Sequence, residues 1–411
     1  MAKKEQSDKG ARLAHSNEGS ADSHRPVESV GVPSLDELVK GTVADFEALS
    51  RLVGCLQDDK TEAQACRVLH LLAEKIAGTA VDNLQVKSVD VPGTAAPLRL
   101  FLSPAVFTPE LWGRTFAEGL MKSPEQFSSK SIVELGTGSG WISLLLLLRT
   151  EASEVVGLDI NPVAVTLARL NVWLNGTTSD GSYINSQYGV PIVRALRIEE
   201  SDLLAVPLNE NRKFDFVIGC IPQVLHPDAE ATAERRTTDS DLYDLSNYCF
   251  QQGILEDRFG LPLIARALEE AQLCLNPGGK VTIILGGRPG PQAIDAMFRR
   301  RGFEAKLIWS RRIPQADDTD LSSLVKLERH HGIQFHFFIS RNSRQSISAE
   351  TAMKILKADQ EIFHDLLVYT AETRWQKPTF RFLSNLHAMG LDNLRKELDF
   401  SRMTEEQISF L

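Results

Sequence analysis

Hydrophobic positions change their spacing along the chain in a way that separates four regions. Residues 1–33 hold few aliphatic side chains among many Ser, Lys, Glu, Gly and Asp. They cannot bury enough apolar surface to offset the entropy of ordering, so we expect a flexible tail. From 34 to 52 apolar residues recur at helical spacing, and a second helix is predicted over 61–76. A strand over 98–102 and a helix over 110–121 complete a mainly helical region at 34–128.

From Ser131 short apolar runs alternate with helical patterns. The predicted strands are 131–135, 154–159, 193–198, 214–219, 280–285, 305–309 and 334–340, and the helices between them are 141–149, 162–174, 259–275 and 292–301. This succession predicts a mostly parallel sheet with helices on both faces, which is a doubly wound α/β domain over 129–342. A helical pattern returns after residue 343, so we expect a C-terminal helical region over 343–411.

Charge and cysteine usage narrow the classes of function. The formal net charge is -9 and the pI about 5.6, which argues against the phosphate attraction that most nucleic-acid binders use. The five cysteines form no CxxC pair and no cluster with zinc spacing. The N-terminus has no apolar signal segment, and no apolar run is long enough to span a membrane. We therefore expect a cytoplasmic protein without nucleic-acid or membrane partners, and we leave a homo-oligomer open.

The strongest local signal is a strand that leads into three alternate glycines and then a helix. Gly136, Gly138 and Gly140 follow the strand that carries Glu134. Glycine lets the backbone approach a ligand closely, and a helix N-terminus attracts polar groups. The spacing is GxGxG, whereas the dinucleotide fingerprint is GxGxxG. A glycine loop alone is weak evidence and also fits a Rossmann-like domain that binds NAD or nothing.

Two carboxylates later in the chain favour the prediction of an adenosine-binding site. Asp159 ends the next strand, where its carboxylate can accept both ribose hydroxyls, and Asp202 follows the third strand, where an adenine amino group would lie. Glu134 could hold the ammonium of the ligand directly or through water. Asp202 taken alone could instead cap a helix. The predicted cofactor site comprises Glu134, Gly136, Thr137, Gly138, Ser139, Gly140, Trp141, Asp159, Ile160, Asn161, Ser201, Asp202, Leu203 and Gly219.

The fourth strand ends in Gly219-Cys220-Ile221-Pro222-Gln223, at the sheet edge where ligands bind in open α/β folds. Many N-methyltransferases carry Asn-Pro-Pro-Tyr at this place, and the missing Asn and aromatic residue indicate an acceptor without a proton to orient. We predict that Cys220, Ile221, Pro222 and Tyr248 are catalytic. For Cys220 itself, a tight turn without a catalytic role is an equal alternative.

Other polar and aromatic side chains are candidates for substrate binding. Arg258 and Arg288 could hold a carboxylate in a bidentate fork, and tyrosines could face a methyl sulfonium with their π surface. A packing or surface role is the alternative for each of them. The predicted substrate site comprises Phe107, Gln223, Tyr243, Asn247, Arg258 and Arg288.

Several stretches together resemble one family, the methionine S-methyltransferases. The resemblance rests on ELGTGSGWIS, VVGLDINPVAV, IGCIPQVLHP, LSNYC, GILEDRFGLPLIARALEE, GGRPG and QADDTDLSSLVKLE, and it runs from about Phe107 to Phe338. It implies a class I S-adenosylmethionine-dependent methyltransferase fold that transfers a methyl group to the sulfur of L-methionine. S-Adenosylmethionine would be the methyl donor, no metal is required, and S-methylmethionine would be the product. The chain looks like a stand-alone bacterial form, whose relatives are associated with dimethylsulfoniopropionate synthesis.

Two other functions remain open at this point. One is an N-methyltransferase that acts on a protein glutamine or a nucleic acid, and the Cys-Ile-Pro-Gln sequence and the acidic charge argue against it. The other is a catalytically inactive adenosine-ligand binder, and the presence of Glu134, Asp159 and the glycines argues against it.

Overall fold

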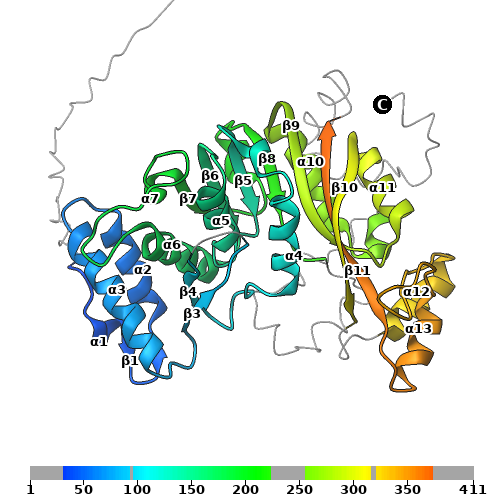
Figure 1. Cartoon of the computed structure of the whole chain (residues 1–411), viewed down its shortest axis with the longest axis horizontal. Coiled ribbons are helices and arrows are strands. Elements are labelled where there is room, and N and C mark those ends of the chain that lie inside the picture. The colour runs from blue at the N-terminus through cyan, green and yellow to red at the C-terminus, as the bar shows by residue number, and fades with distance from the viewer. Residues whose placement is uncertain (1–30, 93–95, 224–254, 316–320, 374–411) are drawn as a thin grey trace, which may run out of the picture. The chain divides into compact units, whose positions relative to one another are not determined.

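Within the described residues, 31–92, 96–223, 255–315 and 321–373 of a computed structural model, one seven-stranded sheet forms the centre of the fold (Figure 1). Its order is β10-β11-β9-β8-β5-β6-β7. Strands β5 to β9 pair in parallel, and β11 is antiparallel to both of its neighbours. The strands are β5 (Ser131–Leu135), β6 (Glu154–Asp159), β7 (Leu196–Glu200), β8 (Phe214–Gly219), β9 (Leu275–Gly286), β10 (Phe303–Pro314) and β11 (Phe363–Thr373).

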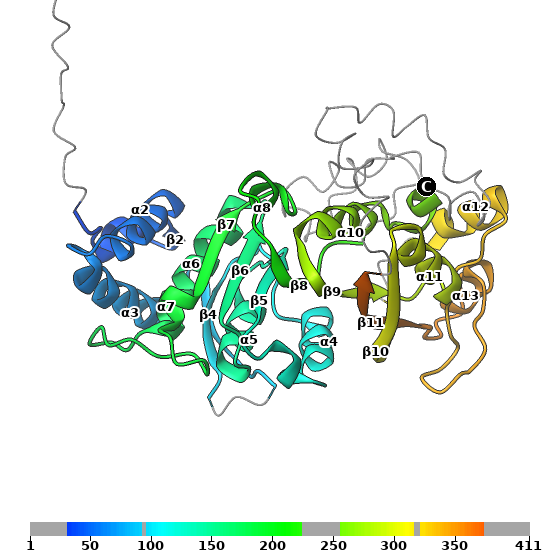
Figure 2. The same cartoon turned by 90° about the horizontal axis from the view of Figure 1, so that it is seen from above.

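Helices cover both faces of this sheet, as Figure 2 shows from above, because alternate strand residues point to opposite sides. Ile132 and Val155 join the buried cluster beneath α4, α5 and α6, whereas Val133 and Val156 join the cluster beneath α10 and α11. The doubly wound α/β class is thereby confirmed. The helices are α4 (Leu111–Leu120), α5 (Trp141–Arg149), α6 (Pro162–Gly176), α7 (Ile192–Ala195), α8 (Ala205–Asn209), α10 (Pro262–Cys274), α11 (Pro291–Arg300), α12 (Leu321–His331) and α13 (Ala349–Leu356), with 3₁₀ helices η1 (Pro124–Phe127) and η4 (Leu255–Phe259).

The N-terminal helices pack on the outer side of α6. Leu167, Leu170 and Trp173 of α6 belong to the same buried cluster as residues of the first three helices. The elements are α1 (Leu35–Leu38), α2 (Phe46–Leu56), α3 (Glu62–Gly78), β1 (Val39–Lys40), β2 (Val43–Ala44), β3 (Gln85–Val89) and β4 (Leu98–Leu102). In the part of the chain that the structure describes, no helix is both long and apolar enough to cross a membrane.

The helical pattern predicted from 34 to 52 is divided into two helices. Ser34 and Glu37 form a capping box that begins α1, and Asp45 accepts hydrogen bonds from Glu47 and Ala48 to begin α2. Between them Gly41 has a φ of +64° and allows the turn from β1 to β2. Apolar periodicity continues across this turn because both helices bury one face, so spacing alone conceals the break.

The expectation of a helical region throughout 343–411 is wrong for Phe363–Thr373, which forms β11. This strand lies between β9 and β10, and its successive residues pack in the two buried clusters on opposite faces of the sheet, so its apolar run does not alternate with polar residues. Conversely, 334–340 is not a strand and makes only isolated bridges from Phe337 and Phe338. The predicted strand 193–198 begins later, at Leu196, after the short helix α7.

Candidate functional site

The tips of β5 and β8 lie side by side at the point where the strand order reverses. Leu135 pairs with Gly219, the last residue of β8. Just beyond them, a methyl group added at Gly136 would lie 3.2 Å from Cγ2 of Ile221. The fold therefore brings the glycine loop and the Cys220-Ile221 tip together, at the switch point where open α/β sheets bind ligands.

The glycine loop is held by the neighbouring strand β6. Gly136, Gly138 and Gly140 have φ values of +65°, +55° and +78°, a region that other residues rarely adopt. The backbone N–H of Thr137 donates to the Leu158 carbonyl at 2.9 Å, and that of Gly138 donates to Asp159 Oδ2 at 2.8 Å. The loop is thus fixed against the carboxylate that the sequence assigns to the ribose.

Asp159 is half-buried, and its orientation is set by the backbone. Its Oδ1 accepts from the Asn161 N–H at 2.9 Å, while Oδ2 accepts from Gly138. Burial raises the pKa of Asp159, although hydrogen bonds from the Asn161, Gly138 and Ile160 backbone oppose this shift. A carboxylate oxygen can accept more than one hydrogen bond, so both oxygens retain acceptor capacity for a diol.

Glu134 points into the sheet face beneath α5 and is fully buried. Its Oε2 accepts from Thr137 Oγ1 at 2.9 Å and from Ser143 Oγ. Burial raises the pKa of Glu134 to about 7 despite these two hydroxyl donors, and the charge of Asp159 adds to the rise. Ser143 was not among the predicted residues; it lies on α5, close in space but outside the glycine motif. Contact between Glu134 and a ligand ammonium stays a prediction.

Because the pKa of Glu134 is raised in the folded protein, ionising it opposes folding as pH rises from about 4.5 through about 7. We expect Glu134→Gln to gain stability relative to the wild type over this interval, by at least ~1 kcal/mol between pH 5 and pH 8. Urea unfolding at both pH values measures the difference. Glu154→Gln, an exposed position on β6, is the matched control and should show no such trend; an equal trend in both variants would contradict the assignment.

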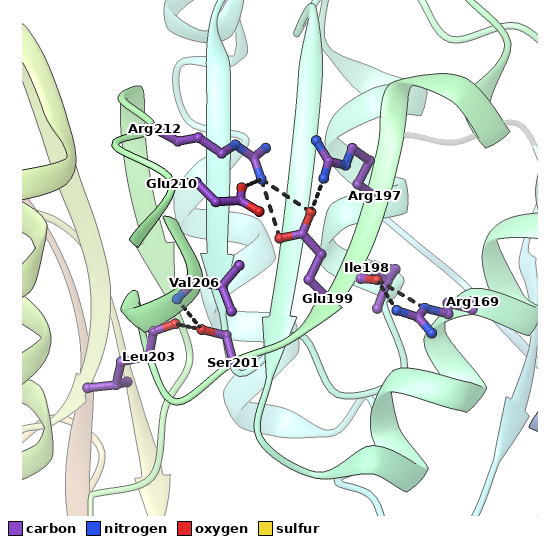
Figure 3. Close-up of polar contacts among 9 residues, drawn as sticks. All are labelled: Arg169, Arg197, Ile198, Glu199, Ser201, Leu203, Val206, Glu210 and Arg212. Carbon is purple, nitrogen blue, oxygen red and sulfur yellow. Dashed lines mark hydrogen bonds and ion pairs between the residues drawn. The ribbon is translucent and has the colours of Figure 1, made fainter. Parts of the chain in front are cut away.

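The segment after β7 is organised by α10 rather than by a helix cap. Asp202 Oδ2 accepts from Arg266 Nη2 at 2.9 Å, Arg266 Nε donates to Glu270 Oε1 at 2.7 Å, and Glu270 Oε2 accepts from the Leu204 N–H at 3.0 Å. Ser201 Oγ donates to the Leu203 carbonyl and accepts from the Val206 N–H (Figure 3). The alternative that Asp202 caps α8 is wrong, because the Asp202 side chain bonds to Arg266 and the first turn of α8 donates to Ser201 Oγ instead. Arg266 and Glu270 were not among the predicted residues; Arg266 lies 64 residues from Asp202, and Glu270 lies 66 residues from Leu204.

The residues present fit an adenosine ligand with an amino-acid end. Asp202 Oδ1 is buried and has no hydrogen-bond partner among the residues that the structure describes, and the same is true of Ser139 Oγ in the glycine loop. A buried polar atom without a partner costs free energy that a ligand can recover. Both atoms lie in segments predicted to bind the cofactor, Asp202 where an adenine amino group can donate and Ser139 beside the positive-φ glycines.

Asn171 supports the glycine loop from α6, and the sequence analysis did not identify it. Its Nδ2 donates to the carbonyls of Ser139 and Phe101, and its Oδ1 accepts from the Phe101 N–H at 2.7 Å. Asn161 Nδ2 likewise donates to the Ala105 carbonyl at 2.9 Å. These amides join the segment before α4 to the site, and the carbonyl oxygen of Phe107 lies 3.8 Å from the position of a Cβ on Gly138.

The predicted substrate residues fall into three groups. Gln223 bonds to the Gly286 backbone through both ends of its amide, which ties the tips of β8 and β9 together. Phe107 is exposed beside the glycine loop, and Arg258 and Arg288 are half-buried. Tyr243, Asn247 and Tyr248 lie outside the described residues. Among the described residues, no three His, Cys, Asp or Glu side chains gather as metal ligands.

A cavity of about 330 Å³ lies away from these tips, along the edge strand β7 and α6. Arg169, Arg194 and Arg197 are among its lining residues. Arg169 donates twice to the Ile198 carbonyl, and Glu199 pairs with Arg197 and Arg212 (Figure 3). The arginines that line this cavity are thus bonded to other groups of the protein. The cavity shares no lining residue with the predicted cofactor and substrate sites.

Comparison with known proteins agrees with this geometry. Residues 120–210 match the family model "Ribosomal protein L11 methyltransferase (PrmA)". The chain is 40% identical over 315 residues to methionine S-methyltransferase of Zea mays, covering 75% of this chain and 29% of that protein. It is 34% identical over 398 residues to the Arabidopsis thaliana protein of the same name, covering 92% and 37%. A putative protein N5-glutamine methyltransferase of Methanocaldococcus jannaschii is 27% identical over 220 residues, covering 53% and 90%.

The chain spans about a third of the length of the plant relatives that it matches. The match nevertheless includes the glycine loop, the β8 tip and most of the sheet, because it extends over three quarters or more of this chain. With its mostly parallel seven-stranded sheet, the protein has the class I S-adenosylmethionine-dependent methyltransferase fold, and its sequence is similar to about a third of the length of plant methionine S-methyltransferases.

Proposed function

We propose that this protein transfers the methyl group of S-adenosylmethionine to the thioether sulfur of L-methionine, giving S-methylmethionine and S-adenosylhomocysteine. The observation that carries the proposal is the tip of β8, where Cys220, Ile221 and Pro222 offer no side chain able to take a proton. The plant relatives named methionine S-methyltransferase support the choice of acceptor.

A thioether nucleophile has no proton to lose, so its methylation needs no general base. Burial raises the pKa of Cys220 to about 12, with a smaller contribution from the charge of Glu134, so its thiol stays protonated at neutral pH. Ile221 is buried against Gly136, and Pro222 has no backbone N–H to donate. When bound, the methyl donor supplies an electrophilic methyl carbon on a sulfonium. The task of the chain is then alignment of the acceptor sulfur and exclusion of water.

Arg288 is the residue that we assign to the carboxylate of the amino-acid substrate. It lies just beyond β9, and burial lowers the pKa of its guanidinium, with no opposing contribution from a carboxylate of the described residues. Asp365, whose carbonyl accepts from the neighbouring Gly287 N–H, has its carboxylate held by Arg312 at 2.7 and 2.9 Å. A half-buried cation without an anionic partner in the described part of the chain favours an anionic ligand, and the guanidinium fork suits a carboxylate.

We expect Arg288→Ala to raise the KM for L-methionine about 30-fold or more, because a charge-assisted contact of roughly 2 kcal/mol or more is lost. The KM for S-adenosylmethionine should change less than threefold. Arg288→Lys keeps the charge without the guanidinium fork, so its KM for L-methionine should lie between those of the wild type and Arg288→Ala. Steady-state kinetics with each substrate varied in turn gives both constants. A similar rise in both would show that Arg288 does not select the amino acid.

The proposed function is tested by incubating the purified full-length chain with S-adenosylmethionine and L-methionine and following products by mass spectrometry. Equal amounts of S-methylmethionine and S-adenosylhomocysteine are expected. Turnover of a glutamine-containing protein instead of L-methionine would favour the N-methyltransferase alternative. The 27% identical archaeal relative, a putative protein N5-glutamine methyltransferase, is the reason for including this substrate. We further propose that the product leads to dimethylsulfoniopropionate, which labelled methionine fed to the producing cells would trace.

A further inference from the structure

A histidine outside the predicted site lies close to Arg288. The antiparallel register of β9 and β11 pairs Gly286 with Leu366. One residue further, the Gly287 N–H donates to the Asp365 carbonyl at 2.7 Å, and a Cβ added at Gly287 would lie 3.1 Å from Cβ of Asp365. The pairing ends there, because the Gly290 N–H donates back to the Gly287 carbonyl in a turn that contains Arg288. Arg288 and His364 are the next residues beyond this last contact, and the charge of Arg288 acts on the His364 imidazole.

Successive residues of a strand point to opposite faces of the sheet. His364 shares its face with Leu366 and Val368, which pack in the cluster beneath α4. Gly286 lies on this side too, where Trp112 of α4 comes within 3.1 Å of the position of its Cβ. Asp365 points to the opposite face of the sheet, where its carboxylate accepts two hydrogen bonds from Arg312.

His364 is 5% exposed, and its Nδ1 is buried without a hydrogen-bond partner in the described part of the chain. Burial, and then the positive charge of Arg288, lower the pKa of His364 to about 3. The imidazole is therefore neutral at physiological pH and carries one N–H donor. A polar side chain buried in this state without a partner costs free energy in the unliganded protein.

We propose that His364 is the second member of the carboxylate-binding site, donating a hydrogen bond to the same substrate carboxylate that Arg288 holds. The inference rests on the proposed function, in which the acceptor is an amino acid. The positive potential that disfavours a proton on His364 also disfavours a substrate ammonium there and favours an anionic group. Two donors, one in the turn after β9 and one on β11, then fix the direction of the carboxylate, and with it the position of the thioether relative to the β8 tip.

The test is calorimetric titration of L-methionine into the full-length chain saturated with S-adenosylhomocysteine. We expect His364→Leu to weaken L-methionine binding about tenfold or more, since a hydrogen bond to a charged group is lost. His364→Asn, whose amide can replace Nδ1, should recover most of the affinity. Thr370→Val, on the same strand but bonded to Thr282 instead, is the matched control and should bind like the wild type.

An analogue without the carboxylate, 3-(methylsulfanyl)propan-1-amine, makes the test specific. If His364 contacts the carboxylate, His364→Leu should not weaken this amine further, whereas a general packing defect would weaken both ligands alike. Equal L-methionine affinity in the wild type and His364→Leu, or no L-methionine binding by the wild type, overturns the inference. Binding that depends on His364 without any S-methylmethionine formed would instead refute the proposed function and leave the carboxylate site standing.

Discussion

Replacing Asp159 with alanine is expected to weaken S-adenosylmethionine binding by more than a hundredfold. The substitution removes the acceptors for the ribose hydroxyls, and each hydrogen bond to a charged group contributes roughly 1.5–3 kcal/mol. It also removes the partner of the Gly138 N–H, which holds the glycine loop in place. Two effects therefore act on the same ligand, one direct and one through the loop.

Calorimetry with S-adenosylmethionine measures this loss, and thermal unfolding establishes that the variant is folded. Glu154→Ala removes an exposed carboxylate at the other end of the same strand, so it should bind as the wild type does. Asp159→Asn keeps one oxygen acceptor and should lose less affinity than Asp159→Ala. Undiminished affinity in Asp159→Ala would exclude the ribose assignment.

Replacing Glu256 with glutamine is expected to lower the free energy of unfolding by about 3 kcal/mol, because it leaves buried arginines without their principal counter-charge. Glu256 Oε1 lies 2.8 Å from Arg301 Nη1 and 2.5 Å from Arg300 Nη2. The Glu256 side chain is only 3% exposed and that of Arg301 only 7%. The ion pair joins η4 to the C-terminal end of α11. Arg258 of the predicted substrate site lies on the same 3₁₀ helix.

The sign of the pH effect follows from the pKa of Glu256. Burial alone would raise this pKa, but Arg301 and Arg300 outweigh it and the pKa is lowered. The contribution is therefore present at neutral pH and is lost progressively as the pH falls below the ordinary value of 4.5 and through the lowered pKa of the folded protein, so the difference between wild type and variant should narrow. Urea unfolding at pH 7 and pH 3.5 tests both points. Glu350→Gln breaks the exposed pairs with Arg329 and Lys354 and should leave the free energy of unfolding nearly unchanged; equal losses would contradict the role of burial.

Local patterns predicted most of the parallel sheet. Strands at 131–135, 154–159 and 214–219 have the bounds that the structure gives, because buried parallel strands are continuous apolar runs and glycines end them. The glycine loop and Asp159 were predicted for the same reason: positive φ and the end of a strand are properties of neighbouring residues. Whether they bind S-adenosylmethionine stays a prediction.

Contacts between distant segments could not be predicted in this way. Asp202 was identified, but its partner Arg266 lies on α10, and nothing in the sequence around either residue specifies the other. His364 falls in a segment expected to be helical, so it was not considered beside Arg288. The error arises from β11. Buried clusters cover both faces of this strand, so its apolar residues do not alternate with polar ones as in a half-buried strand.

By itself, then, the sequence determined the fold class, the family resemblance and the residues at each strand tip, because these depend on spacing over a few positions. Only the tertiary structure decided which tips meet, with Leu135 beside Gly219 and the glycine loop against Ile221. It also decided that a strand from 363 to 373 inserts between β9 and β10 and brings His364 close to Arg288. Strand order is a global choice, set by which hydrophobic faces can be buried together, and no local pattern encodes it.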